Sequence, residues 1–363
     1  MIETFTYEAL PIRVRFGRGT LAEAGAEVAR LGAARALVLT TPEQAEAGAR
    51  LAGVLGPLGA GVFSGATMHT PVEVTDTALA ALKAADADCV VALGGGSTTG
   101  LGKALALRTG VPQLVIPTTY AGSEMTPILG ETQDGRKTTI RSLDVLPEAV
   151  IYDVDLTLTL PAALSATSGV NAIAHAVEAL YARDRNPVIS LMAEDGIRTL
   201  SSALPILVHE PANMEARTKA LYGAWLCGCC LGAVGMALHH KLCHTLGGTF
   251  NLPHAETHTI VLPHAVAYNA PAAPDAMAAI TRALGAPDAA QGLFDLVRAL
   301  GVPRALADIG MPADGIERAA DLAVENPYWN PRPVTRDGIR DLIARAFAGE
   351  RPVAAAGPRE EAA

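Results

Sequence analysis

The sequence predicts a chain of two parts, an α/β domain with a mainly parallel sheet followed by an all-α domain. In the first part, short apolar runs rich in β-branched residues alternate with helical stretches, which is typical of parallel strands covered on both faces. After Leu160 and Pro161 the strand signals fade and helical spacing takes over. We therefore expect an α/β domain over residues 1–157, a helical domain over 158–350 and a disordered tail over 351–363.

The elements of each domain follow from these patterns. The strands expected in the first domain are Ala36–Thr40, Gly61–Ser64, Cys89–Leu93, Gln113–Ile116 and Ala149–Tyr152, with an Ala-rich helix at Val74–Ala87. The helices expected in the second domain include Ala162–Ala182, Pro187–His209, Met214–Cys230 and Leu231–Leu246.

The composition is that of a soluble enzyme. The 363 residues, half of them hydrophobic, are enough for two cores. The net charge of -9 argues against nucleic acid and anionic membranes as partners, so any anionic substrate needs a local basic site. The N-terminus lacks the features of a signal peptide, and no apolar run is long enough to span a bilayer.

The cysteines predict a reducing compartment. Five are present, and Cys227, Cys229 and Cys230 are crowded in an apolar stretch, which disfavours a disulfide framework and fits the cytoplasm. Cys227 and Cys230 have CxxC spacing without a second pair, which favours small apolar residues on a buried helix over a zinc site.

A glycine-rich loop follows the expected strand Cys89–Leu93 and precedes a helical stretch that contains Lys103. Glycines let the backbone approach a pyrophosphate, and the helix start offers free N–H groups. The pattern is not the GxGxxG fingerprint, and a plain strand-to-helix turn has similar composition. We expect nucleotide binding by its residues, Gly94, Gly95, Gly96, Ser97 and Thr98.

A second polar loop, Pro117–Glu124, follows the next expected strand. Thr118, Thr119 and Ser123 offer hydroxyl groups for a ribose or phosphate, although a polar loop with a serine or threonine turn is a common alternative. Two such loops at successive strand ends favour the nucleotide site.

Six of the nine histidines lie between His239 and His264. His240 and His244 are four residues apart and share one face of a helix, whereas His254 follows a Gly-Gly break and Pro253 and lies on a second element. Such a cluster binds a transition metal, or it handles protons and polarises a carbonyl group.

Asn171 and His175 are also four residues apart, in an apolar helix. A core histidine and an N-terminal helix position would account for each residue alone. Beside the histidine cluster, a shared site is the favoured interpretation.

The order of these motifs resembles the iron-containing alcohol dehydrogenase family across nearly the whole chain: GGGS, PTT…GSE, the helix with a four-spaced pair, and HxxxHxLGG…PH. The chain is also similar to the dehydroquinate synthase-like architecture. This resemblance implies a dinucleotide-binding α/β domain, a helical catalytic domain and an active site in the cleft between them.

In metal-dependent members of the family, the resemblance places an Asp ligand at Asn171 and three His ligands at His175, His240 and His254. An amide is a poorer ligand than a carboxylate for a hard cation, although three imidazoles alone can hold zinc. We therefore expect these to be vestigial metal positions and the cofactor to be NADH or NADPH without a metal.

Four strings, MHTPVEV, PTTYAGSE, HHKLCHTLGG and NPYWNPRP, are similar to one branch of the family that has given up the metal. That resemblance implies reduction, during the degradation of aromatic compounds, of a carbon–carbon double bond conjugated to a ketone in a small dicarboxylate. A homodimer is expected as well.

The resemblance also implies roles for individual residues. His244 would be the proton donor, with His175, His240 and His254 around an enolate oxygen. The substrate would contact Asn171, Lys241, Arg332 and the backbone near Tyr120; for Arg332 and for the further candidate Arg141, a solvated surface charge is an equal alternative. Lys137 would contact the cofactor ribose, and Thr41 stands where metal-dependent relatives often carry an Asp that favours NAD. The loop with Asn326, Trp329 and Asn330 could close the cleft.

Three other functions fit parts of this pattern. A metal-dependent alcohol or hydroxyacid dehydrogenase of the same family would hold Fe or Zn at the three histidines. A lyase-type cyclase on the same scaffold needs more Lys and Arg for a phosphate-bearing sugar. A non-enzymatic nucleotide-binding protein would leave the dense polar residues at the expected cleft without a role.

Overall fold

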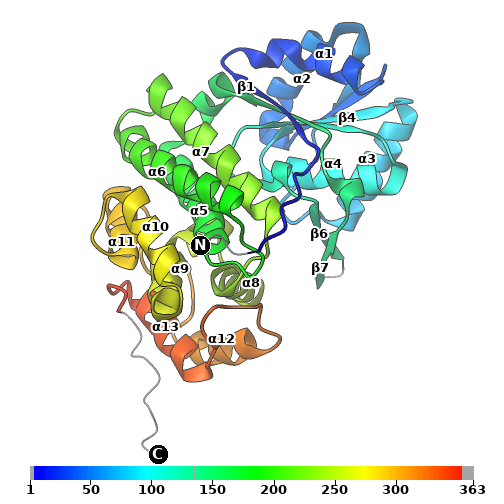
Figure 1. The fold of residues 1–363 in the computed structure, drawn as a ribbon. Coiled ribbons are helices and arrows are strands. Elements are labelled where there is room, and N and C mark those ends of the chain that lie inside the picture. Colours follow the sequence, from blue (N-terminus) through cyan, green and yellow to red (C-terminus); the bar gives the residue numbers. More distant parts are fainter. Residues whose placement is uncertain (1–3, 134–135, 354–363) are drawn as a thin grey trace, which may run out of the picture. The chain divides into compact units, whose positions relative to one another are not determined.

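The computed structural model describes residues 4–133 and 136–353, except for the side chain of Lys137. These residues form two compact units (Figure 1). One spans Ala9–Leu160, and the other begins at Pro161 and also includes residues 4–8.

The first unit is built on a six-stranded sheet in the order β1-β8-β5-β4-β2-β3, and each pair of neighbouring strands is parallel. Its strands are β1 (Arg13–Gly17), β2 (Ala36–Leu39), β3 (Gly59–Phe63), β4 (Cys89–Gly94), β5 (Gln113–Pro117) and β8 (Ala149–Asp153). Its helices are α1 (Ala24–Arg30), α2 (Ala45–Leu55), α3 (Val72–Ala84) and α4 (Gly96–Thr109).

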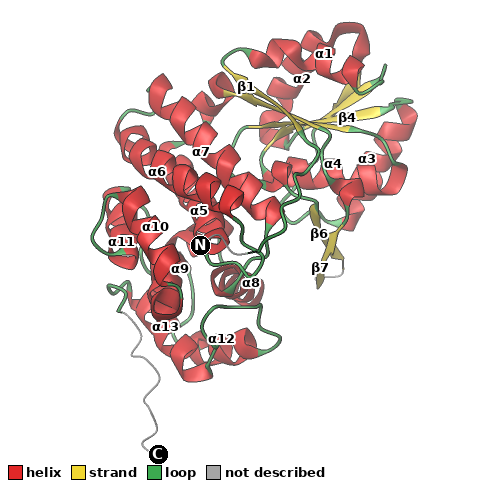
Figure 2. Cartoon of the chain, in the orientation of Figure 1, coloured by secondary structure: helices red, strands yellow, loops and turns green. Residues whose placement is uncertain are grey.

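Helices cover both faces of this sheet (Figure 2). Successive side chains of a strand point to opposite faces, and β2 shows the result: Val38 packs with residues of α1 and α2, whereas Leu37 and Leu39 pack with residues of α3 and α4. The predicted parallel sheet, covered on both sides, is confirmed.

Three strands lie outside the predicted set. β1 pairs with β8 at the edge of the sheet. β6 (Ile128–Gln133) and β7 (Arg136–Arg141) form a separate antiparallel hairpin. The five strands that were predicted are all present, with ends that differ by one or two residues.

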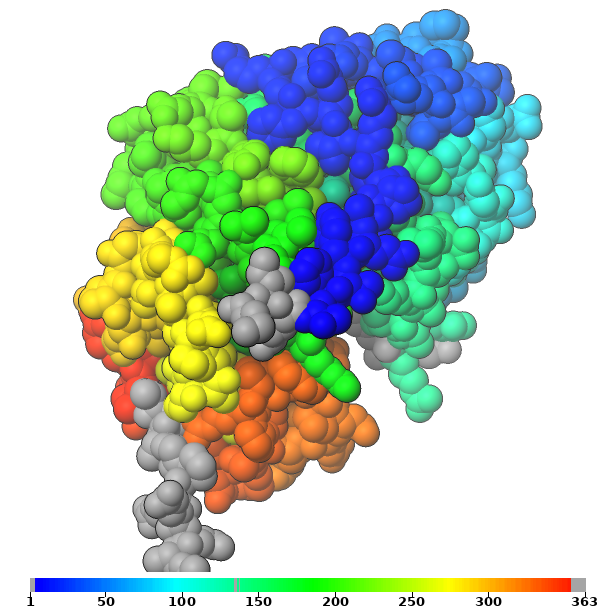
Figure 3. Space-filling view, viewed as in Figure 1, coloured from blue at the N-terminus to red at the C-terminus, as the bar shows by residue number. Residues whose placement is uncertain are grey.

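The described residues of the second unit form helices and their connecting segments, without a strand. The space-filling view shows the surfaces of α6 and α7 in green and of α10 and α11 in yellow along one face of this unit (Figure 3). The helices are α5 (Ala162–Leu180), α6 (Pro187–His209), α7 (Met214–Ala233), α8 (Leu238–Phe250), α9 (His254–Asn269), α10 (Pro274–Leu284), α11 (Ala289–Ala299), α12 (Gly315–Val324) and α13 (Arg336–Ala348).

Two local predictions for this unit were wrong. The helix predicted over Leu231–Leu246 is interrupted, because α7 ends at Ala233 and α8 begins at Leu238. The expected Gly-Gly break is absent, since α8 continues to Phe250 and ends at Asn251 in a left-handed conformation. His254 nevertheless begins a new helix, α9.

No single helix in the described part of the chain is long and apolar enough to cross a membrane. The pair α7 and α8 meets the length and composition test only together, with a bend of 94° between them.

Candidate functional site

The glycine-rich loop lies at the carboxyl end of β4, where α4 begins. Gly94 has a φ of 153°, and a Cβ atom there would lie 2.4 Å from Thr98 Oγ1 and 2.7 Å from Gln44 Oε1. Gly95 precedes α4 and provides no side-chain cap. Gly96, Ser97 and Thr98 form the first turn, whose N–H groups suit an anion.

The second polar loop meets the first, because β4 and β5 are neighbours with Gly94 opposite Pro117. The backbone N–H of Thr118 donates to the Gly94 carbonyl over 2.9 Å, and a Cβ atom on Gly95 would lie 3.0 Å from Thr119 Cγ2. The two loops therefore form one edge of the sheet, as expected from their places in the sequence. The Tyr120 side chain, in contrast, is fully buried.

The side chain of Lys103 binds the backbone of this second loop by hydrogen bonds. Its side chain is fully buried, and Nζ donates to the carbonyl oxygens of Ser123, Thr126 and Ile128 over 2.6, 2.7 and 2.8 Å. Burial lowers the pKa of Lys103 to about 7, against the opposing effect of Glu124. Ser123 thus contributes its backbone oxygen to the tether.

The residues expected near the adenosine end are less closely grouped. Thr41 directly follows Thr40 at the end of β2 and precedes a short 3-10 helix. The pKa of Glu43 is lowered mainly by a hydrogen bond from its own backbone N–H and, to a smaller extent, by one from the Thr41 hydroxyl. A carboxylate therefore lies at this corner despite the Thr at position 41. Lys137 lies on β7, and its side chain is outside the described part of the protein.

The second unit gathers imidazole rings from three helices. The His175 ring on α5 lies 5.1 Å from the His240 ring on α8, and His244 lies 6.4 Å from His254 on α9. The four histidines singled out from the sequence thus lie close together. Asn171 precedes His175 by one turn and is also buried.

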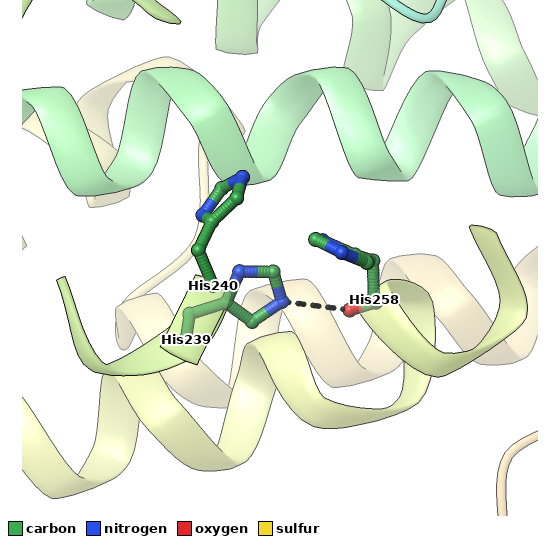
Figure 4. Close-up of side chains that lie close together, drawn as sticks. All are labelled: His239, His240 and His258. Carbon is green, nitrogen blue, oxygen red and sulfur yellow. Dashed lines mark hydrogen bonds between the residues drawn. The ribbon is translucent and has the colours of Figure 1, made fainter. Parts of the chain in front are cut away.

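His258 is a further member that sequence reasoning missed. It is fully buried, 4.9 Å from the His240 ring and 4.2 Å from the His254 ring. It follows His254 by four residues, so helical periodicity alone could have found it. Figure 4 shows it beside His239 and His240.

His239 belongs to the same cluster but points its Nε2 at the backbone. This nitrogen donates to the His258 carbonyl oxygen over 3.0 Å (Figure 4). One nitrogen from each of His239, His240 and His258 lies within 4.8 Å of the others.

Several polar atoms of the cluster are buried without a partner among the described residues. They are Asn171 Oδ1, His175 Nδ1, His239 Nδ1, His240 Nε2 and both nitrogens of His258. Buried polar atoms are normally satisfied, so these atoms mark a place where a ligand, an ion or water belongs.

The buried imidazoles are held neutral. Burial lowers the pKa of His175, His240 and His258 well below the usual value, and neighbouring histidines add to the effect. Burial also lowers the pKa of His239 to about 4. At least one histidine of the cluster was expected to be protonated, and only the exposed His244 and His254 remain candidates for this.

A cavity of about 270 Å³ lies beside the exposed end of the cluster, lined by Lys241, His244, Thr245, Glu325 and Asn326 among others. Lys241 and His244 are three apart on α8 and so face the same way. His244 Nδ1 also lies 3.4 Å from the Tyr328 hydroxyl.

Arg332, Asn330 and Arg141 are not part of this cavity. Arg332 Nη1 donates to the Tyr268 carbonyl over 2.9 Å and lines a different cavity of about 430 Å³. Asn330 exchanges hydrogen bonds with Asn269. Arg141 is exposed at the end of β7 in the other unit.

Two family models together match most of the chain. The model described as iron-containing alcohol dehydrogenase matches residues 11–154, and the C-terminal model of the Fe-containing alcohol dehydrogenase family matches residues 165–347. The chain belongs to the iron-containing alcohol dehydrogenase family.

Within the family, the chain is similar to proteins named maleylacetate reductase. It is 58% identical to that of Rhizobium sp. strain MTP-10005, covering 97% of this chain and all of the relative, and 58% identical to that of Burkholderia cepacia with the same coverage. The crystal structure of maleylacetate reductase from Agrobacterium tumefaciens superposes with a TM-score of 0.94 at 59% identity, covering 97% of this chain and 100% of that one.

The family name implies iron, and the donor set can hold such an ion. Imidazole suits Fe, Zn and Cu. Of the ligands that the resemblance implies, Asn171, His175 and His240 each have a buried polar atom without a partner among the described residues. One nitrogen from each of His239, His240 and His258 also lies within 4.8 Å of the others. Asn171 offers an amide oxygen in place of the negative charge that a carboxylate would bring.

Proposed function

We propose that this oxidoreductase uses NADH or NADPH to reduce the conjugated double bond of 2-maleylacetate, giving 3-oxoadipate. The observation that carries the proposal is the imidazole cluster with Asn171 in place of a carboxylate, in a chain closely similar to maleylacetate reductases. The first unit would bind the nucleotide, and the second would supply the groups that act on the substrate.

The reaction places specific demands on those groups. Hydride from the nicotinamide adds to one carbon of the double bond, and the electron pair moves to the ketone oxygen to form an enolate. A proton then adds to the carbon next to the ketone, so that substrate, NADH and one proton give product and NAD⁺. Positioned donors must stabilise the oxygen, and each is worth about 10²–10³ in rate.

His244 is the best placed proton donor. It is exposed and lines the same cavity as Lys241, and its contact with the Tyr328 hydroxyl orients the ring. The buried rings behind it are neutral and have lowered pKa values, so they are suited to accept hydrogen bonds rather than to take up a proton.

Lys241 would bind a carboxylate of the substrate, because it brings a cation to that cavity. The Thr245 hydroxyl lies on the same face of α8, although it is used within the helix, donating to the Lys241 carbonyl. Glu325 lines the cavity as well and would repel a carboxylate on its side, so charge orients the substrate with one carboxylate toward Lys241.

A bound metal would polarise the ketone oxygen as a Lewis acid, and His175, His240 and His254, the positions given by the resemblance, would hold it, with His258 beside His254. We propose that turnover does not require one, because Asn171 removes the charge that helps to retain a divalent cation.

At the expected nucleotide site, Thr41 stands where metal-dependent relatives often carry an Asp, so that carboxylate is absent. Glu43 brings another carboxylate close to this position. We propose that both NADH and NADPH are used, with kcat/KM values within about a hundredfold, or 2.7 kcal/mol. The proposal also includes a homodimer and a cytoplasmic location, and the five cysteines, none of them in a disulfide, support the latter.

The test is steady-state turnover of 2-maleylacetate, followed by NADH absorbance, with each nucleotide and with and without a chelator. Turnover that survives exhaustive chelation supports the proposal. Turnover of simple alcohols that is lost on chelation and restored by Fe²⁺ or Zn²⁺ would instead identify a metal-dependent dehydrogenase.

A further inference from the structure

Glu178 is a fully buried carboxylate that the proposed reaction does not use. It lies on α5, one turn beyond His175, beside the first turn of α8. Oε1 accepts from the His239 backbone N–H over 2.7 Å. Oε2 accepts from the backbone N–H of Ala237 over 2.9 Å and lies 2.7 Å from His240 Nδ1.

These contacts replace a missing cap. The first N–H groups of a helix have no partner within it, and Ala237, which precedes α8, has no side chain that could accept from them. Glu178 satisfies them from another helix, and its negative charge suits the positive end of the α8 dipole. The carboxylate therefore fixes the start of the helix that carries His240 and His244.

The same carboxylate decides which nitrogen of His240 carries the proton. A carboxylate can only accept, so Nδ1 at 2.7 Å must donate, and Nε2 is then left with its lone pair. Nε2 is buried and has no partner among the described residues. A carboxylic acid at Glu178 would reverse both assignments. Burial raises the pKa of Glu178, and hydrogen bonds from the backbone N–H groups of Ala237, His239 and His240 oppose this rise. Because these three donors converge on its two oxygens, we infer the ionised form.

We propose that Glu178 is a positioning residue that holds His240 as the Nδ1–H tautomer and so leaves its buried Nε2 as an acceptor inside the imidazole cluster. His240 and His244 then have opposite tasks, although they lie one turn apart on α8. His240 accepts a hydrogen bond, and the exposed His244 donates a proton. Only the activity measurement below depends on the proposed function.

The tautomer can be measured directly in the wild-type protein. Long-range ¹H–¹⁵N NMR spectra of histidine-labelled protein distinguish a protonated from an unprotonated ring nitrogen, and loss of one signal set in His240→Asn assigns it. A proton on Nδ1 of His240 is the expected result. A proton on Nε2 at neutral pH would overturn the proposal, whatever the protein does to maleylacetate.

Glu178→Gln tests the consequence for turnover. The amide keeps the size and still accepts from one backbone N–H, but its NH₂ group donates to Nδ1 and shifts the proton of His240 to Nε2. We expect kcat for 2-maleylacetate to fall about 10–100-fold, with KM and NADH affinity within about threefold of wild type. Glu178→Asp, which keeps the carboxylate, should retain more activity than Glu178→Gln.

Glu215→Gln is the matched control, since Glu215 is an exposed partner of Lys219 on α7; it should leave kcat unchanged. A Glu178→Gln protein with a shifted tautomer and wild-type kcat would overturn the proposal. So would a fall in kcat with the tautomer unchanged, which would mean a purely structural role. If wild type itself does not reduce maleylacetate, the proposed function fails while the NMR result still stands.

Discussion

The imidazole of His258 lies 4.2 Å from that of His254, one turn further along α9, and the two differ completely in exposure. His258 is fully buried, whereas His254 is exposed. The two rings thus extend from the surface to the buried part of the cluster, where the nitrogens of His258 have no partner among the described residues. Replacing His258 should therefore lower activity without lowering stability.

His258→Leu should lower kcat for maleylacetate by at least about tenfold without lowering the free energy of unfolding. Both imidazole nitrogens are buried without a described partner, and replacing such a group by an apolar one is neutral or stabilising by about 1 kcal/mol. Urea unfolding and steady-state kinetics measure the two effects. A loss of more than about 1 kcal/mol would show that His258 is satisfied in the protein.

His244→Ala should lower kcat at least about 100-fold, the usual contribution of a general acid, and leave NADH binding intact. His209→Ala, at the exposed end of α6, is the control. Fluorescence titration of NADH and single-turnover kinetics check the two halves of the prediction. Near-normal kcat would remove His244 from the mechanism.

Lys241→Met should raise KM for the dicarboxylate about 10–100-fold, because a hydrogen bond to a charged group contributes about 1.5–3 kcal/mol. The methionine keeps most of the length of the side chain and removes its charge and its N–H donors. Lys219→Met, on the exposed surface of α7, should leave KM unchanged. An equal effect of both variants would point to net charge rather than to the cavity.

Gly94→Ala should weaken NADH binding at least about tenfold, which corresponds to 1.4 kcal/mol. The new methyl group meets Thr98 and Gln44, and the backbone has a φ of 153°, so the loop must shift. Gly53→Ala, in α2 with open space around it, should bind NADH normally and be slightly more stable. Isothermal titration calorimetry compares the two variants.

Acid should destabilise the second unit through His264. Burial, reinforced by Arg345, lowers its pKa from 6.5 to about 4. The unfolded chain therefore binds this proton more tightly, so the stabilising contribution is complete above pH 6.5 and is lost as the pH falls toward 4. Its size is on the order of 3 kcal/mol.

His264→Gln should therefore flatten the decline of the unfolding free energy between pH 6.5 and 4, as measured by urea titrations at several pH values. An unchanged slope would show that the protons taken up on unfolding bind other groups, foremost the buried rings of the cluster.

The sequence was sufficient for the strands that are buried on both faces, because a short continuous apolar run between turn signals is typical of such strands. It did not predict β1, RVRFG, whose arginines reflect the edge of the sheet, where Arg13 pairs with Glu27. The hairpin of β6 and β7 was missed because its residues are mostly polar. The helix does not break at Gly247 and Gly248, where a break was predicted, because neither glycine has a positive φ. Asn251 has one, and the helix ends there instead.

For the site, helical spacing was enough to predict which faces His175, His240 and His244 occupy. The same rule applied to His254 would have found His258. Spacing could not place Arg332, because its partner Tyr268 lies 64 residues away in the sequence. The sequence gives no sign of the role of Glu178, because that role depends on the uncapped start of α8, which only the three-dimensional arrangement reveals.

In the proposed nucleotide site, the hydrogen bonds of Lys103 affect how fast and how tightly the nucleotide binds. The loop after β5 cannot swing open without breaking hydrogen bonds to three backbone carbonyls. This loop is therefore already ordered before the cofactor binds. Little ordering entropy remains to be lost on association, and the on-rate should show no slow rearrangement of this loop.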